Sequence, residues 1–414
     1  MTPFELSVHF FLQLVCVLCV CRAVSWAASK VGQPPVVGEM IAGVLLGPSL
    51  FGVLAPEYQE WLFPKASRPI LFSAAQIGLA LYMFVVGLEF RVDLISSRVR
   101  SALAISISGI IAPFALGCGL AVWLWKSSGY FNPGITLKQA MPYMGAAMGI
   151  TAFPMLARII VERRLTATTA GALALAAGAI DDAAAWCVLA LVLAGIMGKP
   201  ALALNAVGGG VIFLGLLFTV GRVLLRKMTA QGEKDEESCR RMMGWMFVLL
   251  MIAAWFTDKI GLYSVFGAFF LGASVPRGRL CNYMIDMIEP LTTMLLLPMF
   301  FIYSGLNTRM DLMTGATMWL ATLGVLAAAI IGKAGACYAA ARACGESHRE
   351  AIGVGMLMNA RGLMELIILN IGLERGVITP VLFSIMVLMA ILTTVISTPL
   401  FNLTYGKPTE GVVI

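Results

Sequence analysis

The chain of 414 residues is 60% hydrophobic and only 12% charged, with a net charge of +7 and a mean hydropathy of +0.90. This composition excludes a set of water-soluble domains, because so few charged side chains cannot cover their surfaces. The apolar runs are continuous and about 20 residues long, whereas a membrane β-barrel has alternating strands of about ten residues. The sequence therefore predicts an all-α polytopic membrane protein.

Apolar runs that end at charged, Pro or Gly clusters predict about 13 transmembrane helices. In chain order, the expected spans are 4–29, 35–54, 69–89, 101–125, 139–161, 166–196, 201–225, 243–257, 262–276, 286–306, 314–341, 349–373 and 379–402. The first run has no basic segment before it and is long enough to span, so we interpret it as a helix and not as a signal peptide. The eighth and ninth spans are separated only at 258–261.

The distribution of Lys and Arg predicts the orientation of these spans. If the C-terminus is cytoplasmic, 18 Lys and Arg residues fall in inside segments and eight in outside segments. Cytoplasmic loops carry the excess of basic residues, so we expect the N-terminus outside and the C-terminus in the cytoplasm of a bacterial-type inner or plasma membrane. The net positive charge is then a topology signal, and we expect membrane lipids as partners and no nucleic acid.

Three ionisable side chains that could form one site are expected deep in the membrane. Asp181 and Asp182 are adjacent near the middle of the sixth span, and Lys333 lies deep in the eleventh. An ionisable residue at this depth costs several kcal/mol and marks a functional site by default. We therefore predict an ion-binding and proton-transfer site formed by Asp181, Asp182 and Lys333.

A fourth charge, Arg361, falls in the middle of the twelfth span. A buried guanidinium needs an opposite charge more often than it serves as a ligand. Its expected role is therefore structural pairing, and the sequence leaves two partners open, Glu365 and Glu89.

Two segments with helix breakers align with each other and predict an inverted repeat. Residues 144–160 of the fifth span and 352–368 of the twelfth align without a gap at an offset of 208, with Pro154 opposite Gly362. Seven spans separate the two segments, so they cross the membrane in opposite directions. Two inverted repeats with broken helices are typical of transporters that hold an ion or substrate at the bilayer midplane.

The two carboxylates suggest what is carried. Ionised Asp181 and Asp182 are hard oxygen ligands suited to Na+ or K+, and once protonated they no longer attract a cation. Competition between a proton and a cation for one site, together with alternating access, is sufficient for antiport. The sequence predicts no resident cofactor and no enzyme activity.

Two other classes of protein are also considered. An intramembrane aspartyl protease needs two buried aspartates that face each other from different helices, whereas neighbours on one helix point about 100° apart. A potassium channel needs a selectivity filter rich in backbone carbonyls, and the chain has no such sequence motif.

Several motifs resemble the monovalent cation:proton antiporter superfamily, and within it the Kef-type and plant cation/proton exchanger branch. The strings that carry this resemblance are 177–186, 151–154, 297–306, 332–333 and 359–365. The resemblance implies that Asp182 is the main cation and proton ligand and that Asp181 pairs with Lys333 when no cation is bound. It also implies that Thr151 and Asn359 lie at the two helix breaks.

The resemblance further implies an elevator mechanism in a homodimer, with mobile core helices and static dimerisation helices. The expected divisions are 1–99 for dimerisation helices, 100–197 for core helices, 198–242 for a linker helix and cytoplasmic loop, 243–310 for dimerisation helices, 311–402 for core helices, and 403–414 for a short cytoplasmic tail. The resemblance gives no indication of a regulatory soluble subunit.

The aspartate at position 181 is a departure, because Kef-type and plant members often have Asn or Gln there. An Asp-Asp pair with Lys333 resembles the electrogenic sodium/proton antiporters instead. The sequence therefore favours electrogenic exchange of two protons for one cation. Electroneutral Kef-like exchange and the choice between Na+ and K+ stay open.

Overall fold

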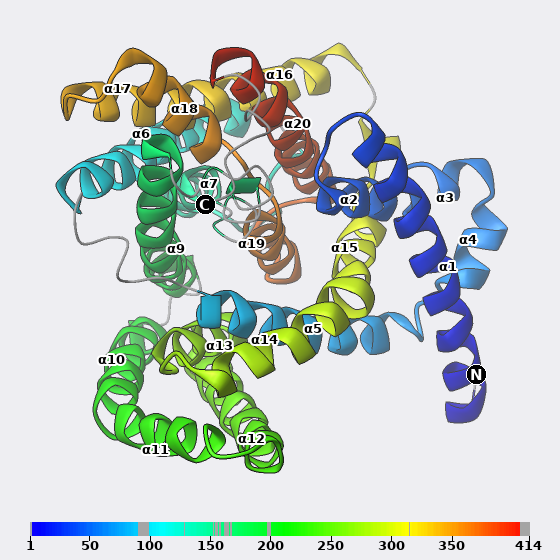
Figure 1. The fold of residues 1–414 in the computed structure, drawn as a ribbon. Helices are drawn as coiled ribbons and strands as arrows, with labels where there is room; N and C mark the ends of the chain where they lie inside the picture. The colour runs from blue at the N-terminus through cyan, green and yellow to red at the C-terminus, as the bar shows by residue number, and fades with distance from the viewer. Residues whose placement is uncertain are drawn as a thin grey trace. The chain divides into compact units, whose positions relative to one another are not determined.

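The computed structural model describes residues 2–89, 99–127, 129–151, 153, 156, 159–160, 165, 168–196, 200–313 and 315–405. Helices account for the regular structure of this part of the chain (Figure 1). Within it, β pairing is limited to one isolated antiparallel bridge between Phe131 and Ile378. The all-α prediction is confirmed for these residues.

The chain folds into two compact units, each built from several separate segments. Unit 1 comprises residues 1–21, 57–91 and 193–303, and unit 2 comprises 22–56, 92–192 and 304–414. The helices wholly or mainly in unit 1 are α4 (Pro56–Leu62), α5 (Arg68–Glu89), α10 (Pro200–Leu216), η2 (Leu217–Gly221), α11 (Arg222–Gly232), α12 (Glu236–Ile260), α13 (Ser264–Ser274), α14 (Arg279–Leu291), η3 (Thr292–Leu296) and α15 (Leu297–Leu306). Helix α1 (Pro3–Lys30) begins in unit 1 and ends in unit 2.

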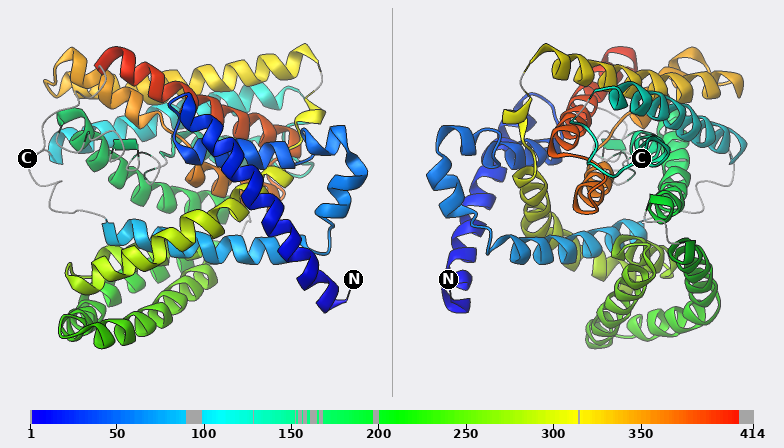
Figure 2. Two further views of the ribbon diagram at one scale, coloured as in Figure 1. Left: turned by 45° about the vertical axis from the view of Figure 1, so that its right-hand side comes forward. Right: turned by 180° about the vertical axis from the view of Figure 1, so that it is seen from behind.

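Unit 2 contains both regions in which the sequence predicts a helix break. Its helices are α2 (Pro35–Leu46), α3 (Phe51–Leu54), α6 (Val99–Trp125), α7 (Leu137–Gly149), α9 (Thr169–Ile196), η4 (Met310–Leu312), α16 (Ala316–Ile330), η5 (Ile331–Gly335), α17 (Ala336–Ala343), α18 (His348–Met358), α19 (Leu363–Glu374) and α20 (Pro380–Tyr405). Helix α6 packs along α7, and α20 packs against α16 and α18 (Figure 2). Helix α6 also contacts η5 and α17, which brings segments about 200 residues apart in sequence into one bundle.

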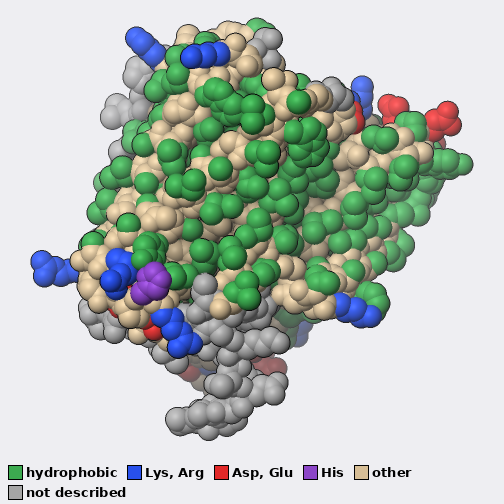
Figure 3. All heavy atoms as spheres, turned by 90° about the horizontal axis from the view of Figure 1, so that it is seen from above, with side chains coloured by type: hydrophobic (Ala, Val, Ile, Leu, Met, Phe, Trp, Pro, Cys, Tyr) green, Lys and Arg blue, Asp and Glu red, His purple; other side chains and the backbone are tan. Residues whose placement is uncertain are grey.

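Nine helical runs in the described residues are long and apolar enough to cross a membrane. Each of the thirteen expected spans overlaps one to three helical elements, and the count of thirteen crossings stays a prediction. Figure 3 shows a face on which hydrophobic side chains predominate and most of the visible Lys and Arg side chains lie at the edge. An apolar surface of this extent is expected where lipid and not water surrounds the protein.

The polar stretch 227–241 differs from the expected cytoplasmic loop, because most of it is helical. Helix α11 continues to Gly232 and α12 already begins at Glu236. The carboxylate of Asp235 accepts a hydrogen bond from the backbone N–H of Ser238, which caps α12 before its apolar part. Helix α12 therefore begins seven residues before the apolar run from which the span was predicted.

Both broken helices fall near the positions expected from the repeat. Helix α7 ends at Gly149, and Ile150 and Thr151 are not helical. In the second repeat, α18 ends at Met358 and α19 begins at Leu363, which leaves 359–362 outside any helix. Pro154 lies outside the described residues. The two regions meet, since the hydroxyl of Tyr143 on α7 donates a hydrogen bond to the carbonyl of Ile368 on α19.

Candidate functional site

A buried ion pair joins α9 to η5 in unit 2. The Nζ atom of Lys333 lies 2.7 Å from Oδ2 of Asp181, and neither side chain is exposed. Two charges withdrawn from solvent are stable only if hydrogen bonds satisfy their remaining donors and acceptors. The surroundings of this pair therefore decide what it can do.

Both oxygen atoms of Asp181 accept hydrogen bonds from hydroxyl groups. Ser106 on α6 donates from Oγ to Oδ1 over 2.5 Å, and Thr151 donates from Oγ1 to Oδ2 over 2.7 Å. Three donors, counting Lys333, thus stabilise the ionised carboxylate. Ser106 could not be identified from the sequence, because it is one of several serines in an apolar helix and its partner lies 75 residues later.

The ammonium of Lys333 is also fully satisfied. Besides Asp181, it donates to the backbone carbonyls of Gly109 and Gly149, each over 2.7 Å. An ammonium has three N–H donors, so all three are used. The carbonyl of Gly149 is available because α7 ends at this residue, and the carbonyls of a last turn have no donor within the helix. The helix break therefore supplies part of the Lys333 site.

A second buried ion pair lies at the other break. Nη1 of Arg361 is 3.2 Å from Oε2 of Glu365, one turn into α19. Nη2 of Arg361 donates to the carbonyl of Met148 over 2.7 Å. Of the two partners that the sequence left open, Glu365 is the one that contacts Arg361. Glu89 is exposed at the end of α5 in unit 1.

Asn359 lies at the break itself and is almost completely buried. Its side-chain Nδ2 donates to Ser397 Oγ on α20 over 3.3 Å. Among the described residues, no hydrogen-bond partner is found for Oδ1 of Asn359, Nε of Arg361 or Oε1 of Glu365. The second cluster is therefore less completely satisfied than the first.

Asp182 follows Asp181 on α9, but its side chain lies outside the described residues. The structure therefore brings together Asp181, Lys333 and Thr151, and separately Arg361 and Glu365. Hydroxyl, carboxylate and carbonyl oxygens converge on the first group, and this is the type of donor set that suits an unhydrated Na+ or K+.

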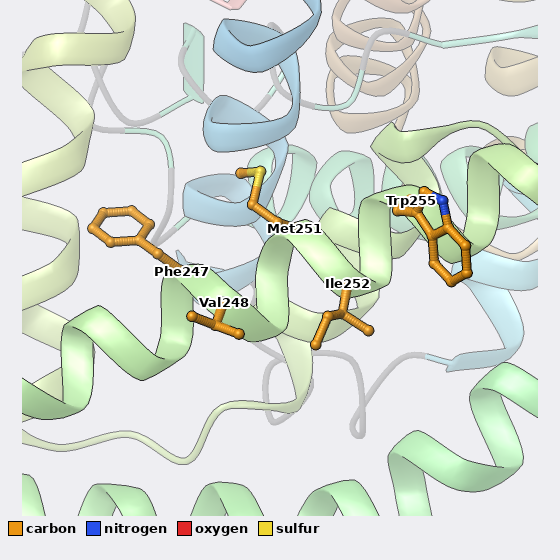
Figure 4. A pocket seen from close by; sticks show the side chains of 5 residues that line it. All are labelled: Phe247, Val248, Met251, Ile252 and Trp255. Atoms are coloured by element: carbon orange, nitrogen blue, oxygen red, sulfur yellow. The ribbon is translucent and has the colours of Figure 1, made fainter.

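Helix α12 in unit 1 carries a shallow groove on its surface (Figure 4). All of its lining residues lie on this one helix: Phe247, Val248, Met251, Ile252 and Trp255. These side chains offer no charged group or oxygen acceptor for an ion. The groove is therefore not a candidate for the ion site.

Comparison with known proteins assigns the class. Residues 15–403 match the family described as sodium/hydrogen exchanger, transmembrane. The chain is 36% identical to the Na+/H+ antiporter NhaS4 of Synechocystis sp., over 95% of this chain and 97% of that protein. It is 33% identical to K+/H+ antiporter 1 of Saccharomyces cerevisiae, over 96% of this chain.

The chain spans about half the length of the plant and yeast relatives that it matches. Its fold is similar to that of the sodium proton antiporter MjNhaP1 from Methanocaldococcus jannaschii, with a TM-score of 0.67 over 96% of this chain and 98% of that one. The sequence identity to MjNhaP1 is 14%, so this likeness concerns the fold.

Proposed function

The chain belongs to the sodium/hydrogen exchanger family of multi-pass membrane proteins, and from this premise we propose that it exchanges Na+ or K+ for protons. The observation that carries the proposal is the Lys333 ammonium, held by three oxygen atoms, one of which belongs to Asp181. The Lys333 ammonium would compete with a transported cation for these oxygen atoms. The family consists of transporters, which supports this reading over an intramembrane protease.

In the proposed cycle, the cation binds to Asp182 and Asp181 after Asp182 releases its proton. The bond between Lys333 and Asp181 then opens, since Asp181 Oδ2 cannot serve the ammonium and the cation equally. Thr151 and Asn359 line the two breaks beside this site, and Arg361 with Glu365 holds the second break in shape. Alternating access would be completed by an elevator movement of the core segments 100–197 and 311–402.

We further propose that exchange is electrogenic. An ammonium that loses its counter-ion in a buried site is costly, and release of a proton removes that cost. Two protons, from Asp182 and Lys333, would then move against one cation. In the electroneutral alternative Lys333 keeps its charge throughout, and one proton moves against one cation.

The choice between Na+ and K+ is a matter for measurement, because relatives named for each cation match this chain. The decisive assay is fluorescence dequenching of an acidified interior in proteoliposomes, with Na+, K+ and Li+ added in turn. A cation-dependent release of the proton gradient is expected for Na+, K+ or both. No release with any cation would contradict the proposed function.

The role of Asp182 is tested by Asp182→Asn. An amide does not titrate, so the variant should lose exchange while remaining inserted and dimeric. The matched control is Asp235→Asn, the same change at an exposed cap of α12, which should leave exchange unaltered. Undiminished exchange in Asp182→Asn would remove this residue from the mechanism.

Electrogenicity is tested by the current that follows cation addition to the protein in a capacitively coupled membrane. A transient current with the sign of net positive charge moving with the protons is expected. Lys333→Gln should retain some exchange but lose its dependence on voltage. Transport by the unaltered protein without charge movement would favour the electroneutral cycle.

The proposed orientation places the exposed thiol of Cys344, between α17 and α18, on the cytoplasmic side. In a variant that keeps Cys344 and lacks the other cysteines, a membrane-impermeant maleimide should label inverted vesicles and not intact cells. Labelling of intact cells would overturn the orientation.

Cross-linking in native membranes tests the proposed homodimer, which should appear as a band of twice the chain mass.

A further inference from the structure

A proline inside α6 leaves one backbone carbonyl without its helical partner. Pro113 lies in the interior of α6 and has no N–H group. The hydrogen bond that residue 113 would donate to the carbonyl four residues earlier is therefore missing. That carbonyl belongs to Gly109, and it is one of the two backbone oxygens that hold the Lys333 ammonium.

We propose that Pro113 is a positioning residue of the exchange site, because it frees the Gly109 carbonyl that anchors Lys333. The spacing supports this role, since Ser106, Gly109 and Pro113 are three and four residues apart and lie on one face of α6. Ser106 on the same face holds Asp181, the counter-ion of Lys333. One face of a single helix therefore holds both members of the ion pair.

Packing fixes Pro113 against the turn that carries Lys333. Lys333 belongs to the π-helical turn η5, and Gly332 of this turn lies so close that an added Cβ would be 3.1 Å from Cα of Pro113. A Cβ at Gly109 would lie 2.8 Å from Sγ of Cys337. Such π turns occur often at functional sites. A side chain at either glycine would therefore require α6 and the segment formed by η5 and α17 to shift apart.

The chain contains the same arrangement at a second place, which provides a matched control. Pro399 lies inside α20 and leaves the carbonyl of Val395 without a helical donor. The side chain of Gln33 donates to this carbonyl over 3.0 Å. Here the donor is a neutral amide that carries no exchangeable charge. Replacement of Pro399 therefore reproduces the backbone change without touching the ion pair.

In Pro113→Ala, the new N–H would draw the Gly109 carbonyl back into the helix. The ammonium would lose part of one acceptor, and Lys333 would give up its proton and its contact with Asp181 more readily. This consequence rests on the proposed competition between Lys333 and the transported cation. Exchange should then reach half of its maximum at a lower pH.

Other charged groups around Lys333 bear on this pH dependence. Within the described residues, those that interact with its ammonium are Asp181, Cys337 and Glu365. Of the helices packed against η5, α16 has no ionisable side chain. The ionisable side chains of the others are Arg100 and Cys118 on α6, Cys337, Tyr338 and Arg342 on α17, and His348, Arg349 and Glu350 on α18. None of these groups is altered in Pro113→Ala or Pro399→Ala.

The first measurement is the pH profile of exchange in proteoliposomes for the unaltered protein, Pro113→Ala and Pro399→Ala. The half-maximal pH should fall by about half a pH unit in Pro113→Ala, the size expected if one charged hydrogen bond is weakened and not lost. It should not move in Pro399→Ala. An unchanged profile in an active Pro113→Ala protein would overturn the proposal, as would an equal shift in both variants.

The second measurement does not depend on transport. Cyanate carbamylates only the neutral amine, and Lys333 is fully buried. The rate of Lys333 modification, read by mass spectrometry at fixed pH, therefore reports how often the ammonium leaves its contacts and gives up its proton. Pro113→Ala should react about threefold faster than the unaltered protein, the rate equivalent of half a pH unit. Pro399→Ala should react at the unaltered rate, and equal rates for all three proteins would contradict the proposal.

The two measurements separate this inference from the proposed function. If the unaltered protein exchanges no cation, the proposed function fails, and the carbamylation rates still decide the role of Pro113. If Pro113→Ala does not yield folded protein, Pro113→Gly supplies the same N–H while leaving the backbone free to bend, and both readouts apply to it.

Discussion

Two buried ion pairs meet at the end of α7, and they differ in how completely they are satisfied. Lys333 and Arg361 donate to consecutive carbonyls, those of Gly149 and Met148. In the pair of Lys333 with Asp181, every ammonium donor and both carboxylate oxygens have partners. In the pair of Arg361 with Glu365, one guanidinium nitrogen and one carboxylate oxygen have none among the described residues.

The difference teaches which pair suits exchange. An ammonium can release its proton and a guanidinium in a protein does not, so only the Lys333 pair can open without leaving a buried charge behind. Because all three donors of Lys333 are used, a cation that binds Asp181 must displace the ammonium from a fully bonded position. The Arg361 pair is better suited to hold the end of α7 against the second break in every state.

The largest effect is expected from a variant in which both ion pairs contain a guanidinium. Lys333→Arg keeps the positive charge but cannot release a proton, so exchange should fall to background in the dequenching assay. Lys333→Gln serves as the control, because it should retain some exchange although it removes the charge. Exchange in Lys333→Arg at the unaltered rate would mean that the ammonium need not titrate.

A second effect concerns stability and the Arg361 pair. Arg361→Met leaves Glu365 and the Met148 carbonyl without their cation, and loss of one partner of a buried pair costs about 3–5 kcal/mol in the free energy of unfolding. The midpoint of thermal unfolding in detergent should therefore fall clearly. The same change at the exposed Arg375 should alter stability by less than about 0.5 kcal/mol. Equal midpoints for the two variants would show that Arg361 is not an anchor.

A smaller loss is expected at the first pair from Ser106→Ala. The change removes the hydroxyl donor to Asp181 Oδ1 and should lower the free energy of unfolding by about 1.5–3 kcal/mol, the range for a hydrogen bond to a charged group. Ser73→Ala is the control, since Ser73 is exposed on α5 and, within the described residues, its hydroxyl bonds only to the carbonyl of Pro69. If thermal unfolding does not separate the variants, the contact with Asp181 contributes nothing.

The smallest expected effect concerns Asp235, an exposed carboxylate that, like the buried Asp181, accepts a hydrogen bond from a serine hydroxyl. Hydrogen bonds from the backbone N–H and hydroxyl of Ser238 hold the pKa of Asp235 below its usual range. The folded pKa is lower than the unfolded one, so this contribution is present near neutral pH and is lost as pH falls through the folded pKa. The midpoint of thermal unfolding should fall slightly less at acidic pH in Asp235→Asn than in the unaltered protein. An identical pH dependence in the two proteins would show that the contact between Asp235 and Ser238 does not contribute to this fall.

The sequence by itself determined the class of protein and which charged side chains lie within its apolar segments. Continuous apolar runs of about 20 residues have one structural solution in a bilayer, because backbone groups there must bond within the segment. Charges in such runs are costly enough to be noticed one at a time, which is why Asp181, Lys333 and Arg361 stood out without any structure. The repeat, with Pro154 opposite Gly362, predicted one helix break in each of the segments 144–160 and 352–368.

Only the tertiary structure decided what surrounds those charges. Ser106 and the carbonyls of Gly109 and Met148 reach their partners over 75 to 224 residues of chain, and such contacts leave no local pattern in the sequence. A backbone carbonyl is present at every position, so its use as a ligand depends on whether a helix end or a proline has removed its usual donor. Nothing in the sequence separates Pro113 from other prolines within apolar runs, and its proposed role follows from its place beside the Lys333 turn.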